Sequence, residues 1–94
     1  PTAPLAELKL GKSYIIDMEN LTPHAHPIHL HGMSFKVLSS STRTVQPLVS
    51  DTYLIQPNEK VQLGFVADNP GDWLLHCHII EHQKSGMTSY VRVV

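Results

Sequence analysis

The chain has 94 residues, enough for one domain with one modest core, and its 41% hydrophobic share argues against intrinsic disorder. The formal net charge is −1 and no apolar run approaches the ~20 residues of a membrane span, so we expect neither nucleic acid nor a membrane as a partner. The sequence starts at Pro1, without an initiator methionine and without a signal-peptide pattern. We therefore expect a mature product or a piece of a longer protein. Histidine is the anomaly, because all seven histidines fall into two clusters, at 24–31 and 76–82.

Short runs of β-forming residues alternate along the chain with turns made of Gly, Pro, Asn and Ser. In chain order, a short extended run is predicted within 5–10, followed by strands at 13–19, 28–31, 35–38, 52–55, 60–66, 73–77 and 88–94. The connections are a polar loop at 39–42, a loop or edge segment at 45–49 that contains Pro47, a turn at 69–72 and a segment at 79–85 that could hold one helical turn. This pattern predicts an all-β fold, a β-sandwich or barrel.

The second histidine cluster surrounds Cys77, the only cysteine, which cannot form an internal disulfide. Side chains alternate along a strand, so His76 and His78 are expected on one face and Cys77 on the other. One short segment could therefore contribute to two metal sites, joined by a few covalent bonds.

The first cluster is predicted to divide in the same way. His29 and His31 share a face of an extended segment, and Leu30 points the other way. The odd offset to His29 and the fixed direction at Pro27 place His26 on the opposite side. The simplest pairing joins His26 with Cys77 on one side and the imidazoles of residues 29, 31, 76 and 78 on the other.

His82 and Met87 follow Cys77 by five and ten residues, and a loop of that size can return both side chains to the sulfur. Together with His26 they form a trigonal His2Cys set with a weak axial Met, which is typical of a blue-copper site. Zinc is the rival metal, but zinc sites favour four strong ligands and rarely include methionine.

Two stretches resemble the C-terminal copper motifs of multicopper oxidases, the laccase group. These are His26-Pro27-Ile28-His29-Leu30-His31-Gly32 and His76-Cys77-His78-Ile79-Ile80-Glu81-His82 through Gly86-Met87. Asp51-Thr52, the stretch from Ala67 to Trp73 and Val91-Arg92-Val93 also resemble the family's final domain, so the likeness covers roughly 11–94. It implies a Greek-key cupredoxin sandwich over 1–94. Copper nitrite reductases are also cupredoxins, but they space the cysteine and second histidine more widely.

The resemblance implies a role for each residue that matches the family's motifs. His26, Cys77, His82 and Met87 would bind the type 1 copper. His29 would bind the type 2 copper, and His31, His76 and His78 the type 3 pair. Electrons from a reducing small molecule would enter near His82 and pass from Cys77 through His76 and His78 to a cluster that reduces dioxygen.

A complete trinuclear cluster in this family needs two further His-x-His pairs from another cupredoxin domain. The only other such pair here is His24-Ala25-His26, and His26 is already assigned. The chain therefore carries half of the cluster's ligands. We expect a homo-oligomer, most simply a trimer, or a partner cupredoxin domain, and the resemblance implies a secreted or periplasmic protein.

Three functions remain open at this point. The first is the copper redox domain of a laccase-like oxidase. The second is a stand-alone blue-copper electron-transfer or copper-binding module without oxidase turnover. The third is an assembly intermediate or evolutionary-model fragment, in which oligomerisation matters more than turnover.

Other residues have plainer interpretations. His24 is expected at the surface, Met18 and Met33 in packing roles, and Trp73 in the core. Asp51 is either a hydrogen-bonding group beside the site or part of a turn. Solvated charges are expected at Arg43, Lys60, Lys84 and Arg92.

Overall fold

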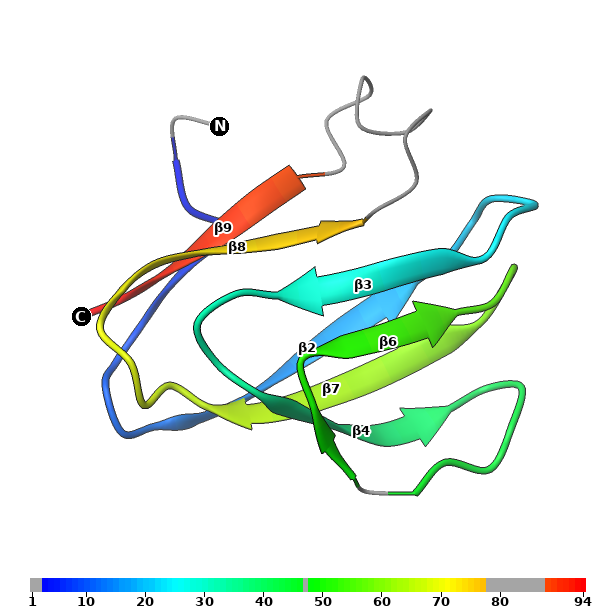
Figure 1. Ribbon diagram of the computed structural model, residues 1–94, viewed down its shortest axis with the longest axis horizontal. Coiled ribbons are helices and arrows are strands. Elements are labelled where there is room, and N and C mark those ends of the chain that lie inside the picture. The colour runs from blue at the N-terminus through cyan, green and yellow to red at the C-terminus, as the bar shows by residue number, and fades with distance from the viewer. Residues whose placement is uncertain (1–2, 47, 78–87) are drawn as a thin grey trace.

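A computed structural model of the chain describes residues 3–46, 48–77 and 88–94, without the side chains of 76, 77 and 88. These residues form nine strands and no helix, and so contain no helix that could cross a membrane (Figure 1). The strands are β1 (Ala6–Leu8), β2 (Ser13–Glu19), β3 (His26–Leu30), β4 (Phe35–Ser40), β5 (Val49–Ser50), β6 (Thr52–Ile55), β7 (Lys60–Val66), β8 (Gly71–Cys77) and β9 (Thr88–Val93).

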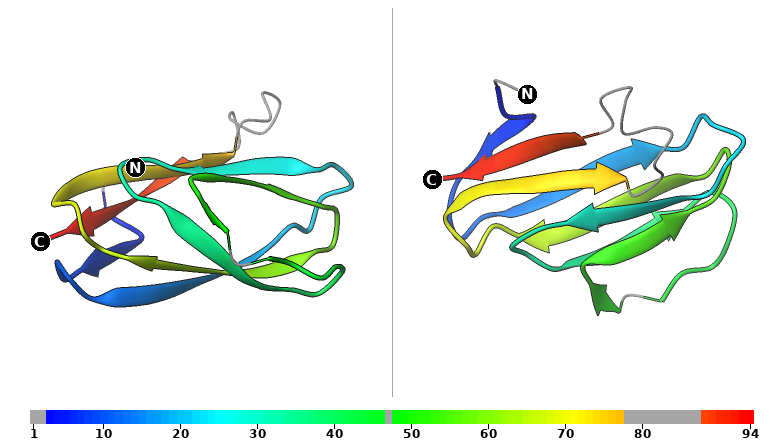
Figure 2. Two further views of the ribbon diagram at one scale, coloured as in Figure 1. Left: turned by 60° about the horizontal axis from the view of Figure 1, so that its bottom comes forward. Right: turned by 45° about the horizontal axis from the view of Figure 1, so that its top comes forward.

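The strands form two sheets that face each other (Figure 2). One sheet has the order β1-β9-β8-β3-β6 and the other β2-β7-β4-β5. Among the described strands, only two successive pairs, β4–β5 and β8–β9, are neighbours in the same sheet. Between the other successive strands from β2 onward, the chain crosses from one sheet to the other. These crossings are typical of Greek-key sandwiches, so the predicted all-β sandwich is confirmed.

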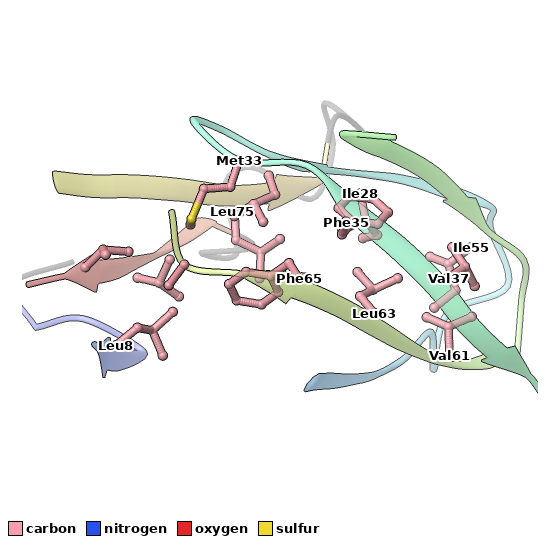
Figure 3. Packing of buried hydrophobic residues seen from close by; sticks show 14 residues of the cluster. Leu8, Ile28, Met33, Phe35, Val37, Ile55, Val61, Leu63, Phe65 and Leu75 are labelled. Carbon is pink, nitrogen blue, oxygen red and sulfur yellow. The ribbon is translucent and has the colours of Figure 1, made fainter. Parts of the chain in front are cut away.

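The core lies between the sheets and follows from the alternation of each strand (Figure 3). In β7, Val61, Leu63 and Phe65 are buried while the residues between them face outward. Met33 is buried as predicted, and Met18 and Trp73 pack against the core from its edge. The two inner faces therefore exclude water along the whole of β3, the strand that carries the first histidine cluster.

Three strands, β2, β6 and β7, have the predicted bounds. β3 begins at His26 because it pairs with β6 on one side, where His26 lies opposite Ile55, and with β8 on the other. β4 continues through Ser40, so the loop predicted from residue 39 begins two residues too early, and its pairing with β7 shifts register after Val37. Among the described residues of 45–49, which exclude residue 47, only Val49 is in a strand, the edge strand β5. β8 begins inside the predicted turn, at Gly71. The helical turn predicted at 79–85 lies outside the described residues.

One end of the sandwich gathers three chain segments (Figure 1, right). β2 ends there, β3 begins, and the turn between β6 and β7 lies beside them. β8 ends at Cys77, opposite Ile28 in the middle of β3. The backbone ties these segments together, because Asn20 N donates to Glu59 O at 3.0 Å and Asn58 N donates to Asn20 O at 2.7 Å. This end holds His26.

Candidate metal centre

β3 presents its histidines to two different environments. His26, Ile28 and Leu30 are buried between the sheets, and His26 is only 1% exposed. His29 is on the other face and partly exposed, and its ring centroid lies 4.5 Å from that of His31. The division of the first cluster into two faces is therefore confirmed.

The register of β3 with β8 brings the two motifs together in the backbone. Ile28 lies opposite Cys77, and His29 lies opposite His76. The side chains of His76 and Cys77, and the whole of His78, His82 and Met87, lie outside what the structure describes. Among the described residues no group of three or more potential ligands comes together, so the two ligand sets stay predictions.

The ring of His29 is oriented by the segment before β6. Its Nδ1 lies 2.9 Å from the carbonyl oxygen of Asp51 and 3.1 Å from Thr52 Oγ1. A carbonyl oxygen only accepts, so the Nδ1–H donates and the lone pair of the neutral ring lies on Nε2. Asp51 thus acts mainly through its backbone, since its carboxylate oxygen is 3.8 Å away. A ring held this way is typical of a metal-binding histidine.

The ring of His26 is held by residues that the sequence patterns did not single out. Its Nε2 lies 2.7 Å from Thr22 Oγ1, and Thr22 bonds in turn to the buried Asn20. The only sequence signal was the polar turn at 20–23, which does not indicate a partner for a particular histidine.

The bend after His31 depends on Gly32. Gly32 has φ +78°, and a Cβ there would lie 2.2 Å from the Trp73 ring. The indole N–H of Trp73 donates to Asn69 O at 2.8 Å, and Asn69 Nδ2 donates to Gly32 O at 2.8 Å. Trp73 therefore serves as packing, as predicted, and fixes the chain where it leaves the histidine pair.

An open hollow of about 1100 Å³ lies beside the histidine pair. His29, His31 and Asp51 line part of it, and the apolar side chains of Ile15 and Leu38 line another part. Ile15 is 59% exposed and Leu38 45%. The outward-facing histidines thus adjoin an apolar surface.

The fully buried carboxylate of Glu59 accepts hydrogen bonds from Ser40, Tyr53 and the backbone of Gln56. Arg43 adds an ion pair at 3.3 Å. Burial by itself raises the pKa of Glu59, but the hydrogen bonds and the positive charge outweigh it and hold the pKa below its ordinary value. Arg43 is exposed, as predicted, but it is also ion-paired, because a buried carboxylate requires partners.

The other charged and polar residues singled out in the sequence lie mostly at the surface. His24 and Lys60 are exposed, as predicted. Arg92 is ion-paired with Asp72 at 2.8 Å rather than simply solvated, because the two residues lie opposite each other on β9 and β8. Lys84 lies outside the described residues.

The described histidines fit copper chemically. Imidazole nitrogen is a ligand that copper accepts readily, and His26 and His29 each have one ring nitrogen bonded to a protein oxygen. That arrangement fixes the plane of each ring, as the hydrogen bonds of metal-binding histidines do.

The family model described as multicopper oxidase matches residues 1–94. The multicopper oxidase MmcO of Mycobacterium tuberculosis is 38% identical over 88 residues, covering 94% of this chain and 17% of that protein. Laccase-2 of Fomitopsis schrenkii is 42% identical over 72 residues, covering 70% of this chain and 14% of that protein.

A multicopper oxidase crystal structure from Pseudomonas thermotolerans matches with a TM-score of 0.91 and 49% identity, covering 97% of this chain and 22% of that one. The McoA multicopper oxidase of Aquifex aeolicus matches with a TM-score of 0.86 and 36% identity, covering 97% and 22%. The chain thus spans about a fifth of the length of these relatives. It belongs to the multicopper oxidase family, and membership of this family implies copper as the cofactor.

Proposed function

We propose that this chain supplies the type 1 copper ligands and half of the trinuclear-cluster ligands of a laccase-like multicopper oxidase. His26, Cys77, His82 and Met87 would hold the type 1 copper. His29, His31, His76 and His78 would contribute to the cluster. The relatives named above are multicopper oxidases and a laccase, which favours this function over a stand-alone electron carrier.

The observation that carries the proposal is the register of β3 with β8. His26 is buried on the inner face, and the histidine pair lies on the outer face. Cys77 and His76 occupy the neighbouring register positions, opposite Ile28 and His29. Directly opposed residues of an antiparallel pair belong to the same face of a sheet, so this register supports pairing His29 with His76.

Within this arrangement the protein positions ligands and joins the two sites. Copper, when bound, supplies one-electron chemistry, with donor oxidation at one site and dioxygen reduction at the cluster. Asp51 holds one ring nitrogen of His29 and thereby orients the other. The peptide through residues 76–78 would connect the two ligand sets covalently.

The other half of the cluster must come from outside these residues. The chain spans about a fifth of the length of its relatives, and the open hollow beside His29 and His31 exposes apolar side chains that another protein surface would cover. Another cupredoxin domain, or further copies of this chain in a trimer, would complete it. A secreted or periplasmic location is part of the same proposal.

Substitution of single ligands, read by absorption spectroscopy and copper analysis, tests the assignment. Cys77→Ser should abolish the strong blue band, and His82→Ala should weaken it. His29→Ala should leave the band and lower only the copper content. His24→Ala is the matched control, because His24 is exposed and outside both motifs, and it should change neither measurement. A blue band that survives in Cys77→Ser would refute the type 1 assignment.

A further inference from the structure

The loop between β2 and β3 is built around the side-chain amide of Asn20, which is 5% exposed. Asn20 Nδ2 donates to the carbonyl oxygens of His24 at 2.6 Å and Ile55 at 3.2 Å. Asn20 Oδ1 accepts from the backbone N–H of Thr22 at 3.0 Å. Two acceptors around the nitrogen and a donor at the oxygen allow only this orientation of the amide.

That orientation determines where the hydroxyl proton of Thr22 lies. Thr22 Oγ1 is 2.7 Å from Asn20 Oδ1 and 3.1 Å from His24 O, and both of these oxygens only accept. The single hydroxyl proton must therefore be donated toward one of them, and the closer is Asn20 Oδ1. The hydroxyl oxygen then offers lone pairs to its other neighbours.

One of those neighbours is His26 Nε2, at 2.7 Å. Because the hydroxyl proton is already donated to Asn20, the proton of this second hydrogen bond must be on the ring. His26 Nε2–H therefore donates, and Thr22 Oγ1 accepts the hydrogen bond. A neutral imidazole has one N–H and one lone pair, so the lone pair of His26 lies on Nδ1. His29 has the opposite tautomer, since its Nδ1–H donates to Asp51 O at 2.9 Å.

We propose that Asn20 and Thr22 are positioning residues that fix the tautomer and ring orientation of His26, so that Nδ1 is the nitrogen presented to copper. This inference rests on the proposed role of His26 as a type 1 ligand. Asn20 gains its own rigidity from the neighbouring turn, because its backbone N–H and carbonyl are bonded to Glu59 O and Asn58 N. The arrangement of the ligand is thus set before metal binds.

The tautomer can be measured without copper. In the copper-free chain labelled with ¹⁵N-histidine, two-bond ¹H–¹⁵N NMR should show His26 protonated at Nε2. Thr22→Val removes the hydroxyl at constant shape and should give a mixture of tautomers, while Thr22→Ser should restore the wild-type signal. Thr42→Val is the matched control, because Thr42 is exposed and its hydroxyl contacts Ser40, and it should change nothing. A wild-type His26 protonated at Nδ1 would overturn the proposal without any variant.

Copper binding supplies the second measurement. Thr22→Val should weaken or shift the blue band and lower copper affinity by about ten-fold or more, with recovery in Thr22→Ser. An unchanged band, affinity and tautomer in Thr22→Val would refute the positioning role. His26→Ala tests the proposed function separately from the positioning role of Thr22. If His26→Ala keeps the blue band, the assignment of His26 to the type 1 copper fails, independently of the result for Thr22→Val.

Discussion

At the scale of single residues, Glu59 is an ionised group with no access to solvent. Its carboxylate is 0% exposed and accepts hydrogen bonds from Tyr53 at 2.6 Å and Gln56 N at 2.7 Å. Its carbonyl oxygen accepts from Asn20 N at 3.0 Å, in the loop that holds His26. The carboxylate therefore anchors the end of the sandwich where that loop lies.

Glu59→Gln should lower the free energy of unfolding at pH 7 by about 1–3 kcal/mol, because it leaves Arg43 and the hydroxyl donors without a negative acceptor. The pKa of Glu59 is held below its ordinary value of 4.5, so its ionisation stabilises the folded state. That contribution is complete above pH 4.5 and is lost as the pH falls through the lower, folded pKa. Urea denaturation at several pH values should show the gap between wild type and variant closing in acid. Asp68→Asn, at an exposed carboxylate, is the control, and a gap that stayed constant with pH would contradict the expectation.

Gly32→Ala should be more destabilising than Gly11→Ala, although both glycines have positive φ, +78° and +85°. A Cβ at Gly11 meets nothing within 4 Å, so that variant should lose only about 1 kcal/mol from backbone strain. At Gly32 the Cβ also collides with the Trp73 ring, which should raise the loss to about 3 kcal/mol or more. Urea denaturation measures both variants, and equal losses would show that Trp73 does not restrain the bend.

At the scale of elements, the strands could be predicted where one sequence signal determined them. The alternation in 60–66 and the β-forming run in 13–19 gave the right bounds for β7 and β2. The start of β3 at His26 was missed because it depends on pairing with β6, a strand that lies far along the chain. Periodicity describes one segment at a time and carries no information on its neighbours.

The candidate site follows the same rule. The two faces of β3 could be predicted from the parity of His26 and His29, because that property belongs to one strand. The support of the His26 ring could not be predicted, and for the His29 ring the sequence offered Asp51 only as one of two alternatives. Thr22 is in an irregular loop, and Asp51 reaches His29 from a segment 22 positions away in sequence. Hydrogen-bond partners across such separations become visible only once the sheets are assembled.

Leu30→Ala should test how strongly β3 depends on the core beneath its histidines. Leu30 is 1% exposed and lies between His29 and His31, so its truncation should remove about 2–5 kcal/mol of stability. Leu54→Ala, on the adjacent strand β6 but 46% exposed, should remove about 0.5 kcal/mol or less. Urea denaturation measures the loss of stability in both variants. Similar losses for Leu30→Ala and Leu54→Ala would mean that β3 is not packed as described.

At the scale of the whole molecule, the histidine pair lines one open hollow together with exposed apolar side chains. Ile15, 59% exposed, and Leu38, 45% exposed, are two of the side chains that line this hollow. Because the chain covers 17% of the Mycobacterium relative and 22% of the Pseudomonas structure, other parts of such proteins are available to cover it. Under the proposed function, a single partner would cover this hollow and supply the remaining cluster ligands.

We therefore expect the isolated chain to associate with further copies through this surface when copper is present. Sedimentation should show an oligomer, most simply a trimer, with copper bound. Ile15→Glu should prevent the association, because it places a charge on a residue that lines the hollow. Leu10→Glu is the matched control: Leu10 is 50% exposed against 59% for Ile15 but does not line the hollow, so it should associate normally. His29→Ala should also weaken the oligomer if the cluster ligands take part in the contact. A monomer with and without copper would refute self-association and leave a different cupredoxin domain as the source of the missing ligands.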